Sequence, residues 1–176
     1  MHGTDDIATE LQHLGEEEPF PYGAVTPPIV QTSLFTARTL RERHASAGME
    51  GIYHYSRVSN PTVELAERKI AALEGTERAL LFASGMAAIA STLLTFLKTG
   101  DHVICVENAY PPTRVLLGEW LPRFGVEASF IPGTEVAQFA DVQRPNTRLL
   151  YLESPTSLTF QLQDLQAVAS WARAHG

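Results

Sequence analysis

From residue 60 onward, short and almost wholly apolar runs alternate with segments of helical character, and this alternation restricts the fold more than any other feature. Apolar runs between helices are typical of strands in a parallel sheet that helices cover on both faces. The predicted strands are residues 78–83, 102–106, 126–131 and 148–153, and the predicted helices are residues 61–74, 84–98, 113–124, 135–140 and 163–175. We therefore predict an α/β fold with a doubly wound, mainly parallel sheet.

The first 58 residues lack this regular alternation, and we predict that they form an extended N-terminal arm. Residues 1–20 contain Asp and Glu but no Lys or Arg, so we expect this part to be mobile or to order on a partner. Residues 22–51 mix turn-forming residues with a short basic helical patch. The predicted division is an arm over residues 1–58 and an α/β domain over residues 59–176.

The formal net charge of -7 argues against nucleic acid or an anionic membrane as the main partner, since both attract basic surfaces. No run approaches the roughly 20 apolar residues that a membrane-spanning helix needs. The single cysteine, Cys105, lies in the apolar run HVICV and is expected to fill the core, which excludes a disulfide framework and predicts a reducing, cytoplasmic location. The histidines show no metal-ligand spacing, and we predict no metal site.

Open parallel sheets bind ligands beyond the carboxyl ends of their strands, where each loop enters a helix with unpaired N–H groups. The first such place is ASGM, residues 83–86, where Gly85 permits close approach and the amides of Gly85 and Met86 begin a helix. Such a helix start suits an anion. A tight turn that needs glycine for steric reasons would contain the same residues, and this alternative stays open.

Two further loops, ENAYPPT (residues 107–113) and ESPTS (residues 153–157), follow predicted strands. Two prolines stiffen the loop of Tyr110, so its ring is suited to stacking on a flat ligand. Glu153 places a carboxylate at the end of the last predicted strand. Each residue has a structural alternative, because a tyrosine can cover the end of a sheet and a carboxylate can cap the next helix.

The tripeptide YSR places Tyr55 and Arg57 two residues apart, on one face of a predicted extended segment. Arginine makes bidentate contacts with phosphate, and tyrosine adds an O–H donor. The pair therefore suits a phosphate dianion, although a tyrosine and an arginine exposed on the surface without a ligand would give the same pattern.

The strings YSRVSNPT, AALEG, SGMAAI, GDHV, AYPPT and LESPT occur in this order between residues 20 and 176. Together they resemble the Cys/Met metabolism family of pyridoxal 5′-phosphate enzymes, which includes cystathionine γ-synthase, cystathionine β-lyase, cystathionine γ-lyase and methionine γ-lyase. The resemblance implies β- or γ-elimination, or γ-replacement, on a sulfur amino acid such as cystathionine, by a cytoplasmic homotetramer built as a dimer of dimers. An unrelated nucleotide-binding domain is disfavoured because the GxGxxG fingerprint is absent.

The same resemblance implies roles for the phosphate-binding candidates. Gly85 and Met86 would offer backbone amides to the phosphate of the cofactor, with Ser84 beside them. Tyr55 and Arg57 would reach the phosphate of the cofactor in a neighbouring subunit.

The resemblance also implies that Tyr110 stacks on the pyridine ring and takes part in proton transfer at the leaving group. Glu153 and Ser157 would belong to the same cofactor site. Ser157 stands where many members have an asparagine that contacts the phenolic oxygen, and AYPPT replaces the more usual YGGT. Both departures are similar to bacterial cystathionine β-lyases and slightly favour that activity.

The family continues, after the segment that corresponds to residues 171–176, to an aspartate that pairs with the pyridine nitrogen, to the Schiff-base lysine and to a C-terminal domain. This sequence contains only Lys69 and Lys98, and neither lies in the family's lysine motif. We therefore expect residues 59–176 to form the first part of a cofactor domain, and the isolated chain to be inactive. A fragment, a truncated gene product, a piece of a split enzyme, and a non-catalytic remnant that assembles with a full-length relative all stay open.

Overall fold

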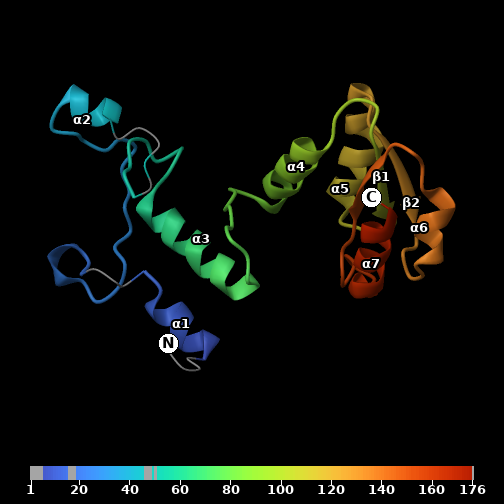
Figure 1. Cartoon of the computed structure of the whole chain (residues 1–176), viewed down its shortest axis with the longest axis horizontal. Helices are drawn as coiled ribbons and strands as arrows, with labels where there is room; N and C mark the ends of the chain where they lie inside the picture. Colours follow the sequence, from blue (N-terminus) through green and yellow to red (C-terminus); the bar gives the residue numbers. More distant parts are fainter. Residues whose placement is uncertain (1–5, 16–18, 46–48, 50, 176) are drawn as a thin grey trace. The chain divides into compact units, whose positions relative to one another are not determined.

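The computed structural model describes residues 6–15, 19–45, 49 and 51–175. They form two compact units, Met1–Leu81 and Phe82–Gly176 (Figure 1). The predicted boundary between arm and domain near residue 58 stays a prediction.

The first unit is built around α3, Pro61–Glu74. The side chain of Asn60 caps this helix by accepting a hydrogen bond from the backbone N–H of Thr62 at 2.9 Å, and Pro61 occupies the first turn. The helix ends at Gly75, whose φ of 64° lies in the left-handed region that favours glycine. These local signals are all visible in the sequence, and the prediction of a helix over residues 61–74 is confirmed.

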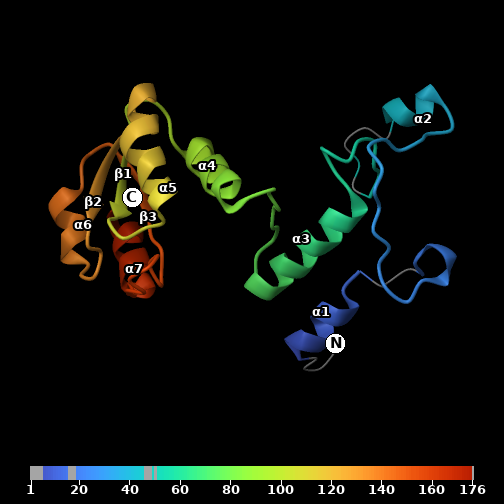
Figure 2. The same cartoon turned by 180° about the vertical axis from the view of Figure 1, so that it is seen from behind.

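The remaining helices of the first unit are short: α1 is Ile7–His13, a 3-10 turn covers Pro21–Gly23, and α2 is Leu40–Ala45. We expected residues 1–20 to remain unpacked, but α1 contacts α3, as Figure 2 shows. The ammonium group of Lys69 on α3 donates a hydrogen bond to the carbonyl of Gln12 at 3.1 Å. Residues 1–5 and 16–18, which contain most of the acidic residues of the segment 1–20, lie outside the described residues.

The extended part of the arm is joined to the start of α3 by side-chain hydrogen bonds. The amide nitrogen of Asn60 donates to the carbonyl of Val30 at 3.0 Å, and the N–H of Val30 donates to the Thr62 hydroxyl at 2.9 Å. An isolated antiparallel bridge pairs Leu34 with Tyr55. Backbone and side-chain hydrogen bonds thus join the arm to the YSR–NPT segment.

The second unit contains a three-stranded parallel sheet in the order β2-β1-β3. The strands are β1 (His102–Val106), β2 (Glu127–Ile131) and β3 (Thr147–Tyr151). His102 is in register with Glu127 on one side and with Thr147 on the other. Every residue of β1 is buried, as the apolar run predicted.

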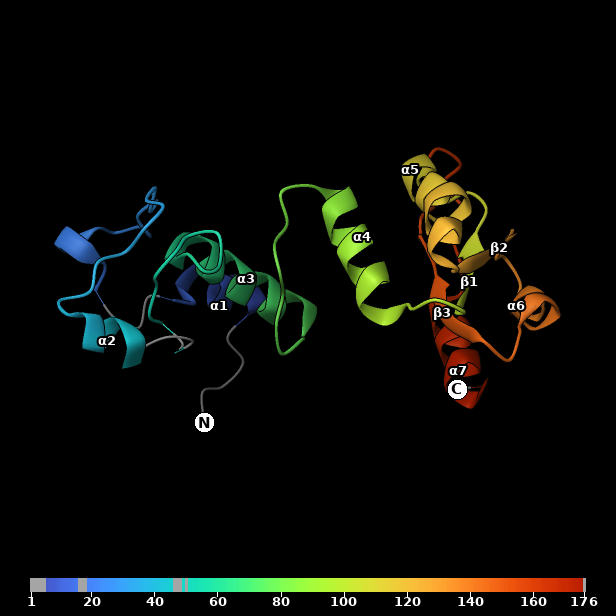
Figure 3. The same ribbon diagram turned by 90° about the horizontal axis from the view of Figure 1, so that it is seen from above.

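Helices cover both faces of this sheet (Figure 1 and Figure 3). They are α4 (Gly85–Phe96), α5 (Pro111–Val115), which continues through a π turn (Leu116–Trp120) and a 3-10 turn (Leu121–Phe124), then α6 (Ala137–Val142) and α7 (Leu165–His175). One face packs Val103 and Cys105 against Leu93 of α4 and Leu117. The other packs Ile104 against the helices α6 and α7. The predicted doubly covered α/β fold is confirmed.

The strand predicted over residues 78–83 does not form, and this prediction is wrong. A strand exists only when a neighbouring backbone pairs with it, and none of the described residues forms a ladder with this segment. Instead, the N–H of Leu81 donates to the carboxylate of Glu67 at 2.8 Å. Leu80 is 72% exposed, so the apolar composition that suggested a buried strand is not matched by burial.

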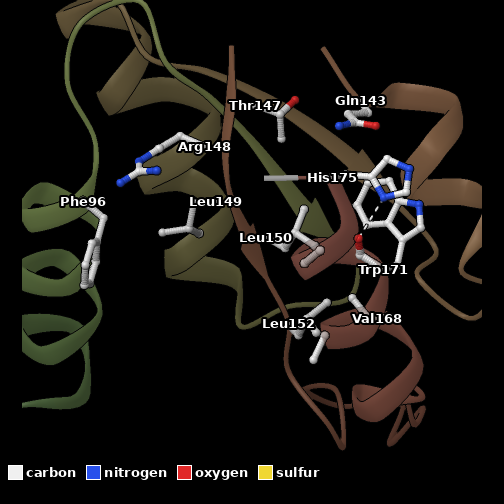
Figure 4. Close-up of a pocket in the computed structure, with 12 residues that line it drawn as sticks. Phe96, Gln143, Thr147, Arg148, Leu149, Leu150, Leu152, Val168, Trp171 and His175 are labelled. Carbon is white, nitrogen blue, oxygen red and sulfur yellow. Dashed lines mark hydrogen bonds between the residues drawn. The ribbon is translucent and has the colours of Figure 1, made fainter. Parts of the chain in front are cut away.

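The strand β3 pairs with β1 along one edge, and no described residue pairs with its other edge. A cavity of about 490 Å³ lies against this strand. Its lining includes Leu149 and Leu150, which are adjacent and so point to opposite faces of the sheet, together with Phe96 of α4 and Trp171 of α7 (Figure 4). The cavity therefore includes side chains from both faces of β3.

Candidate active site

The start of α4 is an amino-terminal helix end with two unpaired amides. Ser84 is the N-cap, and its hydroxyl oxygen accepts a hydrogen bond from the N–H of Ala87 at 3.1 Å. Among the described residues, no acceptor bonds the N–H groups of Gly85 and Met86. These amides, the positive end of the helix dipole and the hydroxyl hydrogen of Ser84 all favour an anion.

The backbone conformation of Gly85 and the space around it bear on the alternative that this segment is only a tight turn. Its φ is not in the left-handed region, so the backbone conformation does not require glycine. A Cβ atom at this position would meet no heavy atom within 4 Å, so packing within the chain does not require glycine either. The missing side chain instead leaves the backbone open to a ligand, which fits the phosphate cradle predicted from the sequence.

Tyr110 lies just beyond β1 and immediately precedes α5. Its backbone N–H donates to the Glu153 carboxylate at 2.8 Å, and its carbonyl accepts from the N–H of Thr113 at 2.9 Å. The side chain is 44% exposed. The structure thus brings the predicted residues Tyr110 and Glu153 together, from loops that follow two adjacent strands.

Ser157 lies in the loop that follows β3, and buried Thr156 holds this loop. The N–H of Thr156 donates to the carbonyl of Gln161, and the N–H of Gln161 donates to the Thr156 hydroxyl, both at 2.8 Å. Ser157 is half-buried, and its carbonyl accepts from the N–H of Thr159. The part of the chain that the structure describes offers no hydrogen-bond partner to its hydroxyl.

Thr113 is a site residue that sequence reasoning missed. It is fully buried, and its hydroxyl contacts the sulfur of Met86 at 3.9 Å, which connects the start of α5 to the start of α4. Burial raises the pKa of the neighbouring Tyr151, and Thr113 acts on that pKa in the opposite direction. The signal available in the sequence was a hydroxyl residue three positions after Tyr110, a spacing typical of the first turn of a helix.

Cys105 lies on the central strand β1 and is fully buried. Burial, with a smaller effect from the negative charge of Glu153, raises the pKa of its thiol to about 12. The thiol therefore stays protonated, which makes it a poor nucleophile. The prediction that Cys105 fills the core is confirmed.

Tyr55 and Arg57 lie side by side in the first unit, with the guanidinium carbon 4.9 Å from the centre of the tyrosine ring. We predicted an extended segment here, and that prediction is wrong. The carbonyl of Tyr55 accepts hydrogen bonds from the N–H groups of Val58 at 2.9 Å and Ser59 at 3.1 Å, which form a turn. The turn brings the two side chains into cation–π contact and leaves Arg57 exposed.

None of the described helices has the length and apolar character needed to cross a membrane. Within the same residues, no three His, Cys, Asp or Glu side chains are grouped in a way that would hold a metal ion.

Comparison with known proteins gives related enzymes along nearly the whole chain. Residues 8–176 match the family model of Cys/Met metabolism PLP-dependent enzymes. The chain is 38% identical over 180 residues to L-methionine gamma-lyase of Pseudomonas putida, a match that covers 100% of this chain and 45% of that protein. It is also 38% identical to cystathionine beta-lyase MetC of Bacillus subtilis, with coverage of 97% and 42%.

Solved structures agree with these matches. The metB structure from Corynebacterium glutamicum superposes with a TM-score of 0.86 at 31% identity, covering 97% of this chain and 43% of that one. A Campylobacter jejuni protein assigned as O-acetylhomoserine (thiol)-lyase, which contains a pyridoxyl-lysine phosphate, also has a TM-score of 0.86, at 25% identity, with coverage of 98% and 42%. The chain spans less than half the length of these relatives. The chain belongs to the family of pyridoxal-phosphate-dependent enzymes of cysteine and methionine metabolism.

Proposed function

We propose that this chain supplies the phosphate-binding part of a pyridoxal 5′-phosphate site, in an enzyme that acts on a sulfur amino acid by β- or γ-elimination or by γ-replacement. The observation that carries the proposal is the start of α4, where the amides of Gly85 and Met86 have no acceptor among the described residues and the space around Gly85 is open. The family is pyridoxal-phosphate dependent, and the match covers residues 8–176.

The residues at the start of α4 fit a phosphate dianion. Gly85 and Met86 donate their backbone N–H groups to it, and the Ser84 hydroxyl donates its hydrogen because its oxygen already accepts from Ala87. Three donors at the positive end of a 12-residue helix suit two negative charges without requiring an arginine side chain from this unit.

Tyr110, Glu153 and Ser157 complete the part of the site that this chain provides. When bound, the cofactor supplies an electron sink for breaking bonds at the amino acid's α-carbon and beyond. The Tyr110 ring would stack on the pyridine ring, and its hydroxyl would move a proton at the leaving sulfur. Ser157 offers its hydroxyl to the phenolic oxygen, in place of the asparagine found in many relatives.

The substrate choice rests on fewer residues. The Ser157 replacement and the AYPPT loop slightly favour cystathionine and β-elimination. Relatives of similar identity carry the names of methionine gamma-lyase and cystathionine beta-lyase, so comparison of L-cystathionine with L-methionine is the direct assay for the whole protein.

The isolated 1–176 chain is expected to bind the cofactor without turning over substrate, because no lysine is placed to bond it. Lys98 follows the carboxyl end of α4, and the 12 residues of that helix separate it by about 18 Å from the cradle at the other end. Lys69 lies on α3 in the first unit, where its ammonium group bonds the carbonyl of Gln12.

The cradle is tested by substituting Gly85→Ala, since the added methyl group would occupy the space that the phosphate needs. Pyridoxine 5′-phosphate is a suitable probe because it carries the phosphate and the ring but an alcohol in place of the aldehyde, so it cannot react with lysine. We expect its dissociation constant, measured by calorimetry, to rise by about tenfold or more, as expected for loss of a hydrogen bond to a charged group.

The matched control is Gly118→Ala in the same unit, where a Cβ would lie 3.6 Å from the Phe130 ring, an ordinary contact distance. We expect no change in affinity for this variant. Equal affinity of the Gly85→Ala and unsubstituted chains, with both folded by circular dichroism, would contradict the proposed cradle.

A further inference from the structure

The ring of Tyr110 has no anchor of its own. Within the described residues, no aromatic contact or hydrogen bond involves its ring or hydroxyl, so the hydrogen bonds that place this residue are those of its backbone. Pro111 follows it and restricts its ψ angle, which is 124°. The placement of the ring therefore depends on what holds the backbone of this one residue.

Three hydrogen bonds hold that backbone. Its carbonyl accepts two, from the N–H groups of Thr113 at 2.9 Å and Arg114 at 3.3 Å, and its N–H donates one, to the Glu153 carboxylate at 2.8 Å. Thr113 is buried and contacts Met86 of the phosphate cradle. The two carbonyl bonds belong to the turn that begins α5, whereas the N–H bond joins loops 43 residues apart in the sequence. Among the residues that the structure describes, Glu153 is thus the one acceptor of this amide.

We propose that Glu153 is a positioning residue, whose carboxylate holds the Tyr110 backbone so that the tyrosine ring is set in place for stacking on the cofactor. The assignment rests on the proposed function, because it gives Glu153 an effect on cofactor binding that passes through Tyr110. A hydrogen bond from an amide to an ionised carboxylate is stronger than one between neutral groups, which suits a contact between two exposed loops.

Two substitutions separate the acceptor from the charge. Glu153→Leu removes the acceptor at similar size, and Glu153→Gln keeps an acceptor oxygen but loses the charge. Glu153→Ala serves as a second removal if the leucine variant does not fold. Gln161→Leu is the matched control, because the Gln161 side chain joins the same two loops by accepting a hydrogen bond from Asn108 at 2.8 Å, and among the described residues it makes no hydrogen bond to Tyr110.

Amide hydrogen exchange of the ligand-free chain, followed by NMR, tests the positioning. We expect exchange of the Tyr110 amide to speed up by about tenfold in Glu153→Leu, the effect of one lost hydrogen bond, with a smaller change in Glu153→Gln and none in Gln161→Leu. An unchanged Tyr110 amide in both Glu153→Leu and Glu153→Ala would overturn the proposal.

A double-mutant cycle with pyridoxine 5′-phosphate tests whether the effect passes through the ring. We expect Glu153→Leu to weaken binding by about tenfold when Tyr110 is present and to have little effect in the Tyr110→Ala background. The same loss in both backgrounds would show that Glu153 acts independently of Tyr110 and would overturn the assignment. If the unsubstituted chain does not bind the probe, the proposed function fails, and the exchange experiment still reports separately whether the carboxylate holds the loop.

Discussion

His102 is a fully buried histidine at the first position of the central strand, and it bonds to both neighbouring strands. Its Nδ1 atom lies 2.8 Å from the Thr147 hydroxyl on β3, and its Nε2 atom lies 2.9 Å from the Ser129 hydroxyl on β2. Hydroxyl groups both donate and accept, so they satisfy a neutral imidazole, which has one donor and one acceptor. Burial, and to a smaller extent the positive charge of Arg144, lowers the pKa of His102 below its ordinary 6.5, while Glu127 acts in the opposite direction.

This arrangement predicts acid sensitivity. Because the folded chain holds His102 neutral, the unfolded chain binds a proton first as the pH falls, so stability decreases from about pH 6.5 downward. We expect urea unfolding to show this loss between about pH 7.5 and 5.5, and the His102→Gln variant to show a smaller pH dependence over that range. An equal slope in both chains would contradict the role of this histidine.

Single residues also show what the sequence could and could not predict at the candidate site. The helix start at Ser84 was predictable because capping depends on neighbours along the chain, and Ser84 caps an amide three residues away. The contact of Thr113 with Met86 could not be predicted, because it joins positions 27 residues apart and exists only after α4 and α5 pack. Whether Tyr110, Glu153 and Ser157 bind the cofactor stays a prediction, and the structure adds the bond between the first two.

At the scale of elements, prediction was accurate where the signal is local. The strand β1 followed from its apolar run, and α3 followed from Asn60, Pro61 and Gly75. The strand predicted over residues 78–83 failed because pairing depends on a neighbour that composition does not reveal. The segment after Pro111 was predicted as a single helix but changes to a π turn and then a 3-10 turn near Pro122, which lacks the N–H that an α-helix would use.

The cap of α3 gives a prediction at this scale, because Asn60 serves both the helix and the arm. Asn60→Asp keeps an acceptor for the N–H of Thr62 but loses the donor to the carbonyl of Val30 and to the Ser56 hydroxyl, whereas Asn60→Ala loses all three bonds. We expect Asn60→Ala to lower the free energy of unfolding by about 1–3 kcal/mol in urea denaturation, and the aspartate variant to lose less.

Amide exchange distinguishes the two effects in Asn60→Asp. The amides of α3 should keep their protection while the N–H of Val30 exchanges faster. Equal destabilisation by the two substitutions would show that the cap contributes little and that attachment of the arm dominates.

The whole molecule raises the question of what Tyr55 and Arg57 contact. We propose that this pair reaches the cofactor phosphate of another subunit, in a homo-oligomer or in a mixed assembly with a full-length relative. The alternative function, a remnant that assembles with such a relative, has support from the exposed guanidinium held over the Tyr55 ring. The chain's coverage of less than half of each relative leaves both assemblies as proposals.

Mixing experiments address this directly. We expect the chain to raise the activity of full-length Pseudomonas putida L-methionine gamma-lyase at limiting cofactor if it contributes Arg57 to a shared site, and Arg57→Ala to abolish the increase. Arg123→Ala is the control, since Arg123 lies over the Trp120 ring at 4.7 Å in a comparable cation–π pair. An increase that persists in Arg57→Ala would contradict the proposed contact, and no increase with the unsubstituted chain would remove support for mixed assembly.

The edge of β3 that no described residue pairs with would make protein concentration a variable of folding. Backbone groups along an open edge pair readily with another strand, and Leu149 and Leu150 beside it offer apolar surface to whatever pairs there. If folded chains associate through this edge, the folded monomer is removed from the folding equilibrium. The folded fraction then rises with protein concentration by mass action. A melting temperature measured at one dilution therefore describes an equilibrium between molecules as much as the intrinsic stability of a single sheet.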